Sequence, residues 1–313
     1  MRLAIALALA ALAAACSSVD EPPQAAQSGP EIPAPPPGEF TPTPSEILDA
    51  SPDADWRPLD PENTLYMDFP GKGRVIIEMA AQFSPNHVAN VRALSREGYF
   101  VNGAVTRVQD NFVAQWAQAA DPPRPPKVGK ETLPAEFKHP YDSSIEFTRL
   151  PDPDTFEDRV GFSGGFPVAR DDSDIWVAHC YGTVGVGREE GDDTGGGIEL
   201  YAIIGQSPRH LDKNLTVLGR VVQGMDILSS LPRGTGEIGF YETPAEYAHY
   251  TDIKLAADVP VADQTPLEVL RTDSETFAAL VNARRWRKDT FYKRPAGRIG
   301  LCNITVPVRP APK

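Results

Sequence analysis

The sequence predicts a mainly β domain in the middle of the chain, and two kinds of pattern support this. Apolar and polar residues alternate over residues 65–69 and 75–79, around a Pro-Gly-Lys-Gly turn at 70–73, which is typical of a β-hairpin. Residues 198–204 form a largely apolar run that indicates a buried strand, and residues 215–222 indicate another. Helical patterns are few and short by comparison.

Length and charge restrict the classes of function. The chain has 313 residues, which is enough to bury a core in one large domain or two small ones. Its formal net charge of −13 excludes nucleic acid as a partner, because phosphate contacts need Lys and Arg. The His residues are scattered without ligand spacing, and no nucleotide-binding loop or Ser/His/Asp arrangement is seen, so no metal or cofactor is expected.

The first residues have the pattern of an export signal. Arg2 precedes an apolar run over residues 3–15, which is shorter than the roughly 20 residues that span a bilayer, so a signal peptide is expected. Small residues then precede Cys16, which resembles bacterial lipoprotein signals, in which this cysteine is acylated and becomes the mature N-terminus. Ser17 rather than Asp follows it, which favours the outer membrane. An ordinary secretory signal cut near the same alanines is the alternative.

We therefore expect a periplasmic protein of a Gram-negative-type bacterium, anchored to a membrane through a lipid. With Cys16 acylated, Cys180 and Cys302 remain, and two thiols in an oxidising compartment can form a disulfide. Their spacing alone does not decide whether they pair. Neither lies in a CxxC pair or a nucleophile motif, so a catalytic thiol is the weaker interpretation.

Residues 17–63 are rich in Pro, Ala, Ser, Glu and Asp and contain much of the excess of proline, 32 residues in the whole chain. They hold too little apolar surface to fold, so a disordered tether between the membrane and the domain is expected. A proline-rich docking ligand is the less common alternative.

After the tether, turn residues in the sequence mark the bounds of the predicted helices and strands. Ser84 and Pro85 indicate the start of a helix that ends at Gly98. A strand, a turn and a strand are expected over residues 103–115. Residues 118–178 are expected to be a long irregular insertion, in which three acidic residues lack the spacing of a calcium loop and indicate a solvated acidic loop: Asp152, Asp154 and Asp158.

Later patterns indicate a strand over residues 182–186, a short helix over 224–228 and a last strand over 250–255. The C-terminal extension, residues 257–313, contains a predicted helix over 276–286 and a predicted strand over 301–308. Its helix ends in a basic cluster of Arg284, Arg285, Arg287 and Lys288. This cluster is either a patch for an anionic lipid surface or an acidic partner, or a solvated helix face that balances an acidic body.

Four sequence blocks carry a resemblance to a known family. Residues 98–103 read GYFVNG, residues 106–115 read TRVQDNFVAQ, residues 182–184 read GTV, and residues 216–226, shortly after a Leu-Asp pair, read TVLGRVVQGMD. In this order, with this spacing from Arg to Phe to Gln, they resemble cyclophilins. The resemblance implies a domain over residues 64–256, with the family fold of a closed eight-stranded antiparallel barrel capped by two helices.

The resemblance also implies an activity, the cis/trans isomerisation of Xaa-Pro bonds in unfolded or partly folded envelope proteins, by a monomer that needs no cofactor. Such an enzyme has to weaken amide resonance, and one donor aimed at the prolyl nitrogen does so. By resemblance, Arg107 is that donor, Phe112 floors the proline pocket, and Gln115 orients Arg107 and bonds the substrate backbone. Six further residues are implied to bind substrate: Val113, Glu199, Tyr201, His210, Leu211 and Leu215.

Several positions depart from the family pattern. Val105-Thr106 replaces Phe-His before the arginine, and Trp116-Ala117 replaces Gly-Gly after the glutamine. Glu199 falls where the family has Gln, and a carboxylate there could pair with Arg107 and draw it from the substrate. The residues taken alone also have plainer interpretations, a surface charge for Arg107 and a core residue for Phe112. Three hypotheses therefore stand: an active isomerase, a catalytically weak peptide-binding or chaperone module, and an envelope scaffold that docks a partner through its tail.

Overall fold

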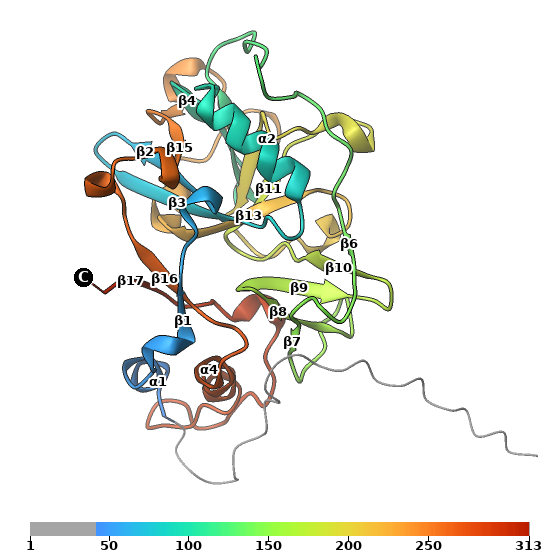
Figure 1. Cartoon of the computed structure of the whole chain (residues 1–313), viewed down its shortest axis with the longest axis vertical. Helices are drawn as coiled ribbons and strands as arrows, with labels where there is room; N and C mark the ends of the chain where they lie inside the picture. Colours follow the sequence, from blue (N-terminus) through green and yellow to red (C-terminus); the bar gives the residue numbers. More distant parts are fainter. Residues whose placement is uncertain (1–41, 313) are drawn as a thin grey trace, which may run out of the picture.

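The structure is a computed structural model that describes residues 42–312, so the predicted signal and Cys16 lie outside the described residues. Its largest part is a nine-stranded antiparallel sheet that curls round a core, in the upper half of Figure 1. In spatial order the strands are β14 (Ala248–His249), β4 (Gly103–Val108), β5 (Val113–Gln118), β12 (Leu200–Ile203), β11 (Thr183–Val186), β13 (Val217–Gln223), β3 (Gly73–Met79), β2 (Thr64–Phe69) and β15 (Ile253–Leu255).

The two outer strands, β14 and β15, are consecutive in the chain. In the connection between them, the backbone N–H of Tyr250 donates to the carbonyl of Gly103, and that of Thr251 donates to the carbonyl of Asp68, at 3.2 and 2.9 Å. This one segment therefore contacts both edges of the sheet. The sheet thus has nine strands where the resemblance implied eight, and of the last strand predicted over residues 250–255 only β15 forms.

The predicted hairpin is confirmed, since β2 and β3 pair antiparallel from Thr64 opposite Glu78 to Phe69 opposite Gly73. The predicted helix is α2 (Pro85–Arg96), with Ser84 at its N-cap. The Ser84 hydroxyl bonds the carbonyl of Val217 instead of the helix. Glu136 of the insertion accepts hydrogen bonds from the first backbone N–H groups of the helix in its place. The predicted short helix is α3 (Met225–Ser229).

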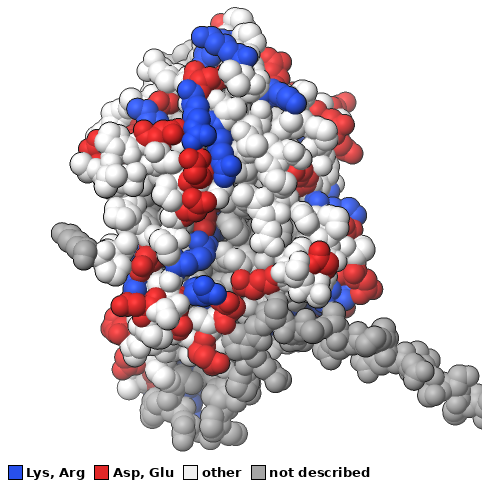
Figure 2. All heavy atoms as spheres, in the orientation of Figure 1, with Lys and Arg blue, Asp and Glu red and all other residues white. Residues whose placement is uncertain are grey.

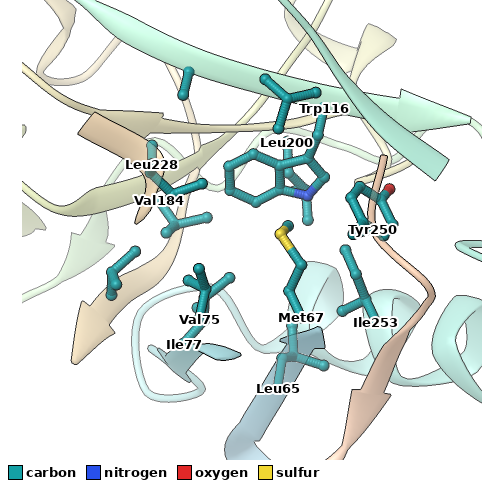
Figure 3. Packing of buried hydrophobic residues seen from close by; sticks show 14 of the residues in the cluster. Leu65, Met67, Val75, Ile77, Trp116, Val184, Leu200, Leu228, Tyr250 and Ile253 are labelled. Carbon is teal, nitrogen blue, oxygen red and sulfur yellow. The ribbon is translucent and has the colours of Figure 1, made fainter. Parts of the chain in front are cut away.

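The core of the curled sheet is filled from every strand. Figure 3 shows the indole of Trp116 in its middle, with the Met67 side chain beneath it and Leu200 beside it. All three side chains are fully buried. The bulky ring that departs from the family pattern therefore points into the core, because successive residues of a strand face opposite sides of the sheet.

The prediction of an irregular insertion over residues 118–178 is wrong for its second half. A five-stranded sheet forms there, in the order β6 (His139–Pro140), β10 (Asp174–Val177), β9 (Phe166–Arg170), β8 (Val160–Ser163) and β7 (Thr148–Arg149). Each strand has only two to five residues. Strands this short show no clear alternation, and they are held by burial of residues such as Phe162 and Trp176.

The predicted tether over residues 17–63 is also wrong at its C-terminal end. Helix α1 (Pro44–Asp49) and strand β1 (Trp56–Pro58) fold there, and β1 pairs with β16 (Leu267–Leu270) of the C-terminal extension. Strand β17 (Val308–Pro310) completes a three-stranded sheet. The predicted strand over residues 301–308 is therefore misplaced, since Leu301–Asn303 is a 3-10 turn. The predicted tail helix is α4 (Glu275–Arg285).

These added segments share one hydrophobic cluster, here called the second core. It joins residues of β1, the insertion and the extension: Trp56, Leu150, Val160, Phe162, Ala169, Trp176, Ala178, Cys180, Val269, Leu270, Phe277, Ala278, Leu280, Val281, Leu301, Ile304 and Val306. Cys180 and Cys302, whose pairing the sequence left open, form a disulfide beside it. The second half of the insertion and the extension are thus parts of one folded unit, below the curled sheet in Figure 1.

Two charge assignments are corrected by this packing. Asp152 is buried and accepts a 2.8 Å hydrogen bond from Arg285, which is itself buried. Asp154 pairs with Arg209. The acidic segment is therefore not simply solvated, and Arg285 belongs to the interior and not to the exposed basic face. No helix among the described residues has the length and apolar character to cross a membrane.

Candidate active site

The β4–β5 hairpin brings the first three predicted residues together. Arg107 lies opposite Gln115 in the register, after a bulge between Val105 and Arg107. Phe112 precedes β5, whose next residues alternate between the outer face and the core. Gln115 is consequently on the same side as Arg107, whereas Trp116 faces the interior.

A pocket of about 170 Å³ opens beside this hairpin. It is lined by residues of β4, β5 and β12, of the turn before β5, and of the loops that follow β11 and β12: Arg107, Phe112, Val113, Gln115, Gly187, Arg188, Tyr201, Leu211 and Leu215. Val113 and Tyr201 form its buried wall together with Ile203 behind them, and Phe112, Leu211 and Leu215 pack against this cluster. The pocket is therefore apolar on one side and carries a guanidinium and an amide on the other.

Arg107 is held by several acceptors. Its Nε donates to the carbonyl of Ile238 and its Nη1 donates to Oε1 of Gln115, both at 2.8 Å, and its Nη2 donates to Oε1 of Gln109. The guanidinium carbon lies 5.7 Å from the ring centroid of Phe112 and 5.5 Å from that of Phe240. These contacts fix the plane of the guanidinium at the rim of the pocket.

Glu199 acts on Arg107 through Gln115. Nε2 of Gln115 donates to Glu199, while its Oε1 accepts from Arg107, so the amide lies between the two charges. The direct ion pair that the sequence suggested is not formed. Burial lowers the pKa of Arg107, and the Glu199 carboxylate opposes that shift. Burial raises the pKa of Glu199, with a contribution from Glu189.

A buried polar chain begins at the pocket wall. The Tyr201 hydroxyl lies 3.0 Å from Nε2 of His179, whose Nδ1 lies 3.0 Å from Asp212. Arg209 donates to Asp212 at 2.6 Å and also pairs with Asp154 of the insertion. Burial acts against ionisation of Asp212, but His179 and Arg209 outweigh it and hold its pKa below the usual value. The chain ties the pocket wall to the insertion.

Most predicted site residues thus meet in one place, with two exceptions. Glu199 lies behind Gln115 and does not line the pocket, and His210, on the turn Arg209–Leu211, is exposed and outside the lining. The sequence reasoning missed residues that hold or line the site, namely Gln109, His179, Arg188, Ile238 and Phe240. Only Gln109 has a local signal, because residues two apart on a strand share a face.

Comparison with known proteins identifies the fold that carries this pocket. Residues 64–246 match the family model described as cyclophilin type peptidyl-prolyl cis-trans isomerase/CLD. Proteins from Brucella suis and Brucella abortus, each named probable peptidyl-prolyl cis-trans isomerase, are 27% identical over 189 residues, which cover 59% of this chain and 80% of each relative.

A solved structure extends this likeness. The crystal structure of the cyclophilin AquaCyp293 from Hirschia baltica is 25% identical, with a TM-score of 0.66, and the match covers 88% of this chain and 100% of that one. The similarity therefore reaches beyond residues 64–246 into the added segments. Since the family model spans more than half of the sequence, this chain belongs to the cyclophilin-type peptidyl-prolyl cis-trans isomerase family.

Proposed function

We propose that this chain isomerises Xaa-Pro bonds in unfolded or partly folded envelope proteins, with Arg107 as the donor to the prolyl nitrogen. The observation that supports this most is the placement of a fixed guanidinium at the rim of an apolar pocket of about 170 Å³. In this proposal the pocket formed by Phe112, Val113 and Leu211 holds the pyrrolidine ring. Gln115 positions Arg107 and bonds the substrate backbone.

The isomerisation needs no nucleophile and no metal from the protein. Rotation about a peptide C–N bond meets a barrier near 18–20 kcal/mol because of resonance. A hydrogen bond to the prolyl nitrogen stabilises the pyramidal, single-bonded transition state, and it is most effective where water is excluded. The guanidinium has five N–H groups, of which its bonds to described residues use three, so two remain for the substrate.

The location is proposed from the sequence signal together with the disulfide. Disulfides persist in oxidising compartments such as the periplasm, and Cys180 and Cys302 pair. We propose a lipid anchor at Cys16, attachment to the outer membrane and action as a monomer. Clients would then be segments of proteins that fold in the envelope.

One observation favours a second candidate, a peptide-binding module with weak catalysis. The Glu199 carboxylate polarises Gln115 and reduces the positive potential of Arg107 at the substrate. Such a module would hold client segments in the same pocket while accelerating isomerisation little.

A refolding assay separates the two candidates. The client is a protein whose slow refolding phase is limited by one Xaa-Pro bond, an event that takes tens of seconds without catalysis. The full chain is expected to accelerate that phase in proportion to its concentration, and Phe112→Ala is expected to lower the slope about tenfold, since the ring packs in the pocket. Val128→Ala, at an exposed position outside the pocket, is the matched control. A chain that suppresses aggregation yet leaves the slow phase unchanged is a binding module.

A further inference from the structure

The segment after α4 carries an unusual surface, here called the basic loop and defined as residues 287–294. Lys288, Lys293 and Arg294 are exposed, and none forms an ion pair with a described residue. Arg287 pairs with Asp289, the only acidic residue of the loop. Three unpaired cations therefore lie within seven consecutive positions of a chain whose formal net charge is −13.

The same loop exposes two aromatic rings. Phe291 is 81% exposed and Tyr292 is 42% exposed, and their rings meet edge to face with centroids 5.0 Å apart. The carboxylate of Asp289 accepts from the backbone N–H groups of both residues, at 2.8 and 2.7 Å. This turn holds the rings outward from the second core. The two adjacent rings therefore form a small exposed apolar patch within a basic surface.

The basic loop lies next to the place where the described chain begins. A hollow of about 410 Å³ is lined by Pro44 of α1 and by the basic loop and its flanks, including Arg284, Arg287, Tyr292 and Arg294. Helix α1 packs against α4, at the bottom of Figure 1, whereas the curled sheet lies at the top. The described chain therefore begins on the side of the molecule that carries this loop.

The basic loop differs from the rest of the described surface because it groups unpaired cations beside exposed aromatic rings. On the face shown in Figure 2, Lys and Arg alternate with Asp and Glu, and ion pairs neutralise much of both. An acidic body is repelled by an anionic surface, so attraction is confined to places where cations stand unpaired. Cations flanked by aromatic rings suit the boundary between headgroups and acyl chains, where rings enter the interface and cations meet phosphate.

We infer that the basic loop docks on anionic lipid headgroups and so orients the molecule on its membrane. The second core then faces the lipid, and the curled sheet with its pocket faces the aqueous compartment, where client segments are. An acyl chain alone would tether the protein without setting its orientation. This surface contact is independent of catalysis, because none of its residues lines the pocket.

The test is a vesicle flotation assay with the full chain. Phosphatidylcholine vesicles are compared with vesicles that also contain phosphatidylglycerol, at a mole fraction of about 0.3. The contribution of any lipid anchor or apolar segment cancels in the ratio of the partition coefficients for the two kinds of vesicle. The test variant combines Lys288→Gln, Lys293→Gln and Arg294→Gln. The matched control removes the same charge from exposed sites on the barrel side, as Lys72→Gln, Lys127→Gln and Lys130→Gln.

The wild type and the control are expected to prefer the anionic vesicles. The test variant is expected to lose about 100-fold of that preference, since each cation near the surface contributes about fivefold, and about 0.5 M salt should have a similar effect. Phe291→Ser is expected to weaken binding to both vesicles while leaving unfolding by urea unchanged. Equal preference in the test and control variants would overturn the proposal, as would binding of the loop to polyglutamate but not to the anionic vesicles.

Discussion

Replacing Cys180 and Cys302 by Ser is expected to destabilise the folded chain, including the second core, to which Cys180 belongs. The two residues lie 122 positions apart, so their disulfide closes a loop that runs from β11 through the barrel to the C-terminal extension. In the unfolded chain this cross-link removes many conformations. In the native state it joins the residues before β11, the central strand of the curled sheet, to the C-terminal extension.

The magnitude follows from the length of the closed loop. The chain-entropy relation gives about 5 kcal/mol at 25 °C for a separation of this size. Losses of about 2–5 kcal/mol are typical when a native disulfide is removed. A domain with an ordinary stability of about 5–15 kcal/mol would lose much of it.

The assay is urea unfolding of the double variant and the wild type, followed by two signals. Fluorescence reports on Trp56 and Trp176 in the second core, with a contribution from Trp116 in the core of the curled sheet, and isomerase activity reports on the pocket. The fluorescence midpoint is expected to fall by about 1–3 M, given a urea slope of about 2–3 kcal/mol per M, while activity without urea is retained. A variant with an unchanged midpoint, next to a wild type whose disulfide is intact by mass spectrometry, would refute the reasoning.

Three further outcomes are expected. Glu199→Gln should raise kcat/KM for a Xaa-Pro peptide about fivefold, because the variant removes an electrostatic interaction on the order of 1 kcal/mol that weakens the effect of Arg107 on the substrate. Burial raises the pKa of Glu199, so its ionisation destabilises the folded state as pH rises. The gain in free energy of unfolding of the variant, measured by urea titration, should therefore be larger at about pH 8 than at about pH 4. Tyr201→Phe should lower stability by about 1–3 kcal/mol and raise KM, because Nε2 of buried His179 loses its partner; unchanged melting and KM would show that the polar chain does not support the pocket. Ile238→Asn should raise stability by about 1 kcal/mol in thermal melts, because Ile238 has φ of 47°, a left-handed conformation that Asn tolerates better; a less stable variant would contradict this.

The barrel was expected from the resemblance of four sequence blocks to cyclophilins, and several of its elements could also be predicted from local signals. Alternation placed β2 and β3, and the Ser84-Pro85 pair placed the start of α2. The spacing from Arg107 to Gln115 placed both side chains on one side of a hairpin, as the register shows. Each of these features depends on residues within about ten positions of one another.

The parts of the fold and the site that the sequence did not predict depend on contacts between residues far apart in the chain. Ile238 and Phe240 hold Arg107 from a loop about 130 positions away, and nothing in their own neighbourhood indicates this. Likewise, β1 gains its structure from β16 and from the burial of Trp56, so a segment that looks too polar to fold does fold against a partner at the far end of the chain. The short strands of the insertion are stabilised in the same way.

Exchange between cis and trans isomers of a Xaa-Pro peptide, measured by NMR, tests the role of Arg107 most directly. The wild-type chain is compared with Arg107→Ala, Arg107→Lys and the control Arg96→Ala, whose exposed ion pairs lie outside the pocket. We expect kcat/KM to fall about 100-fold or more in Arg107→Ala and partly in Arg107→Lys, with folding intact and the control unchanged. If Arg107→Ala is folded and isomerises the peptide as fast as the wild type, Arg107 is not the catalytic donor.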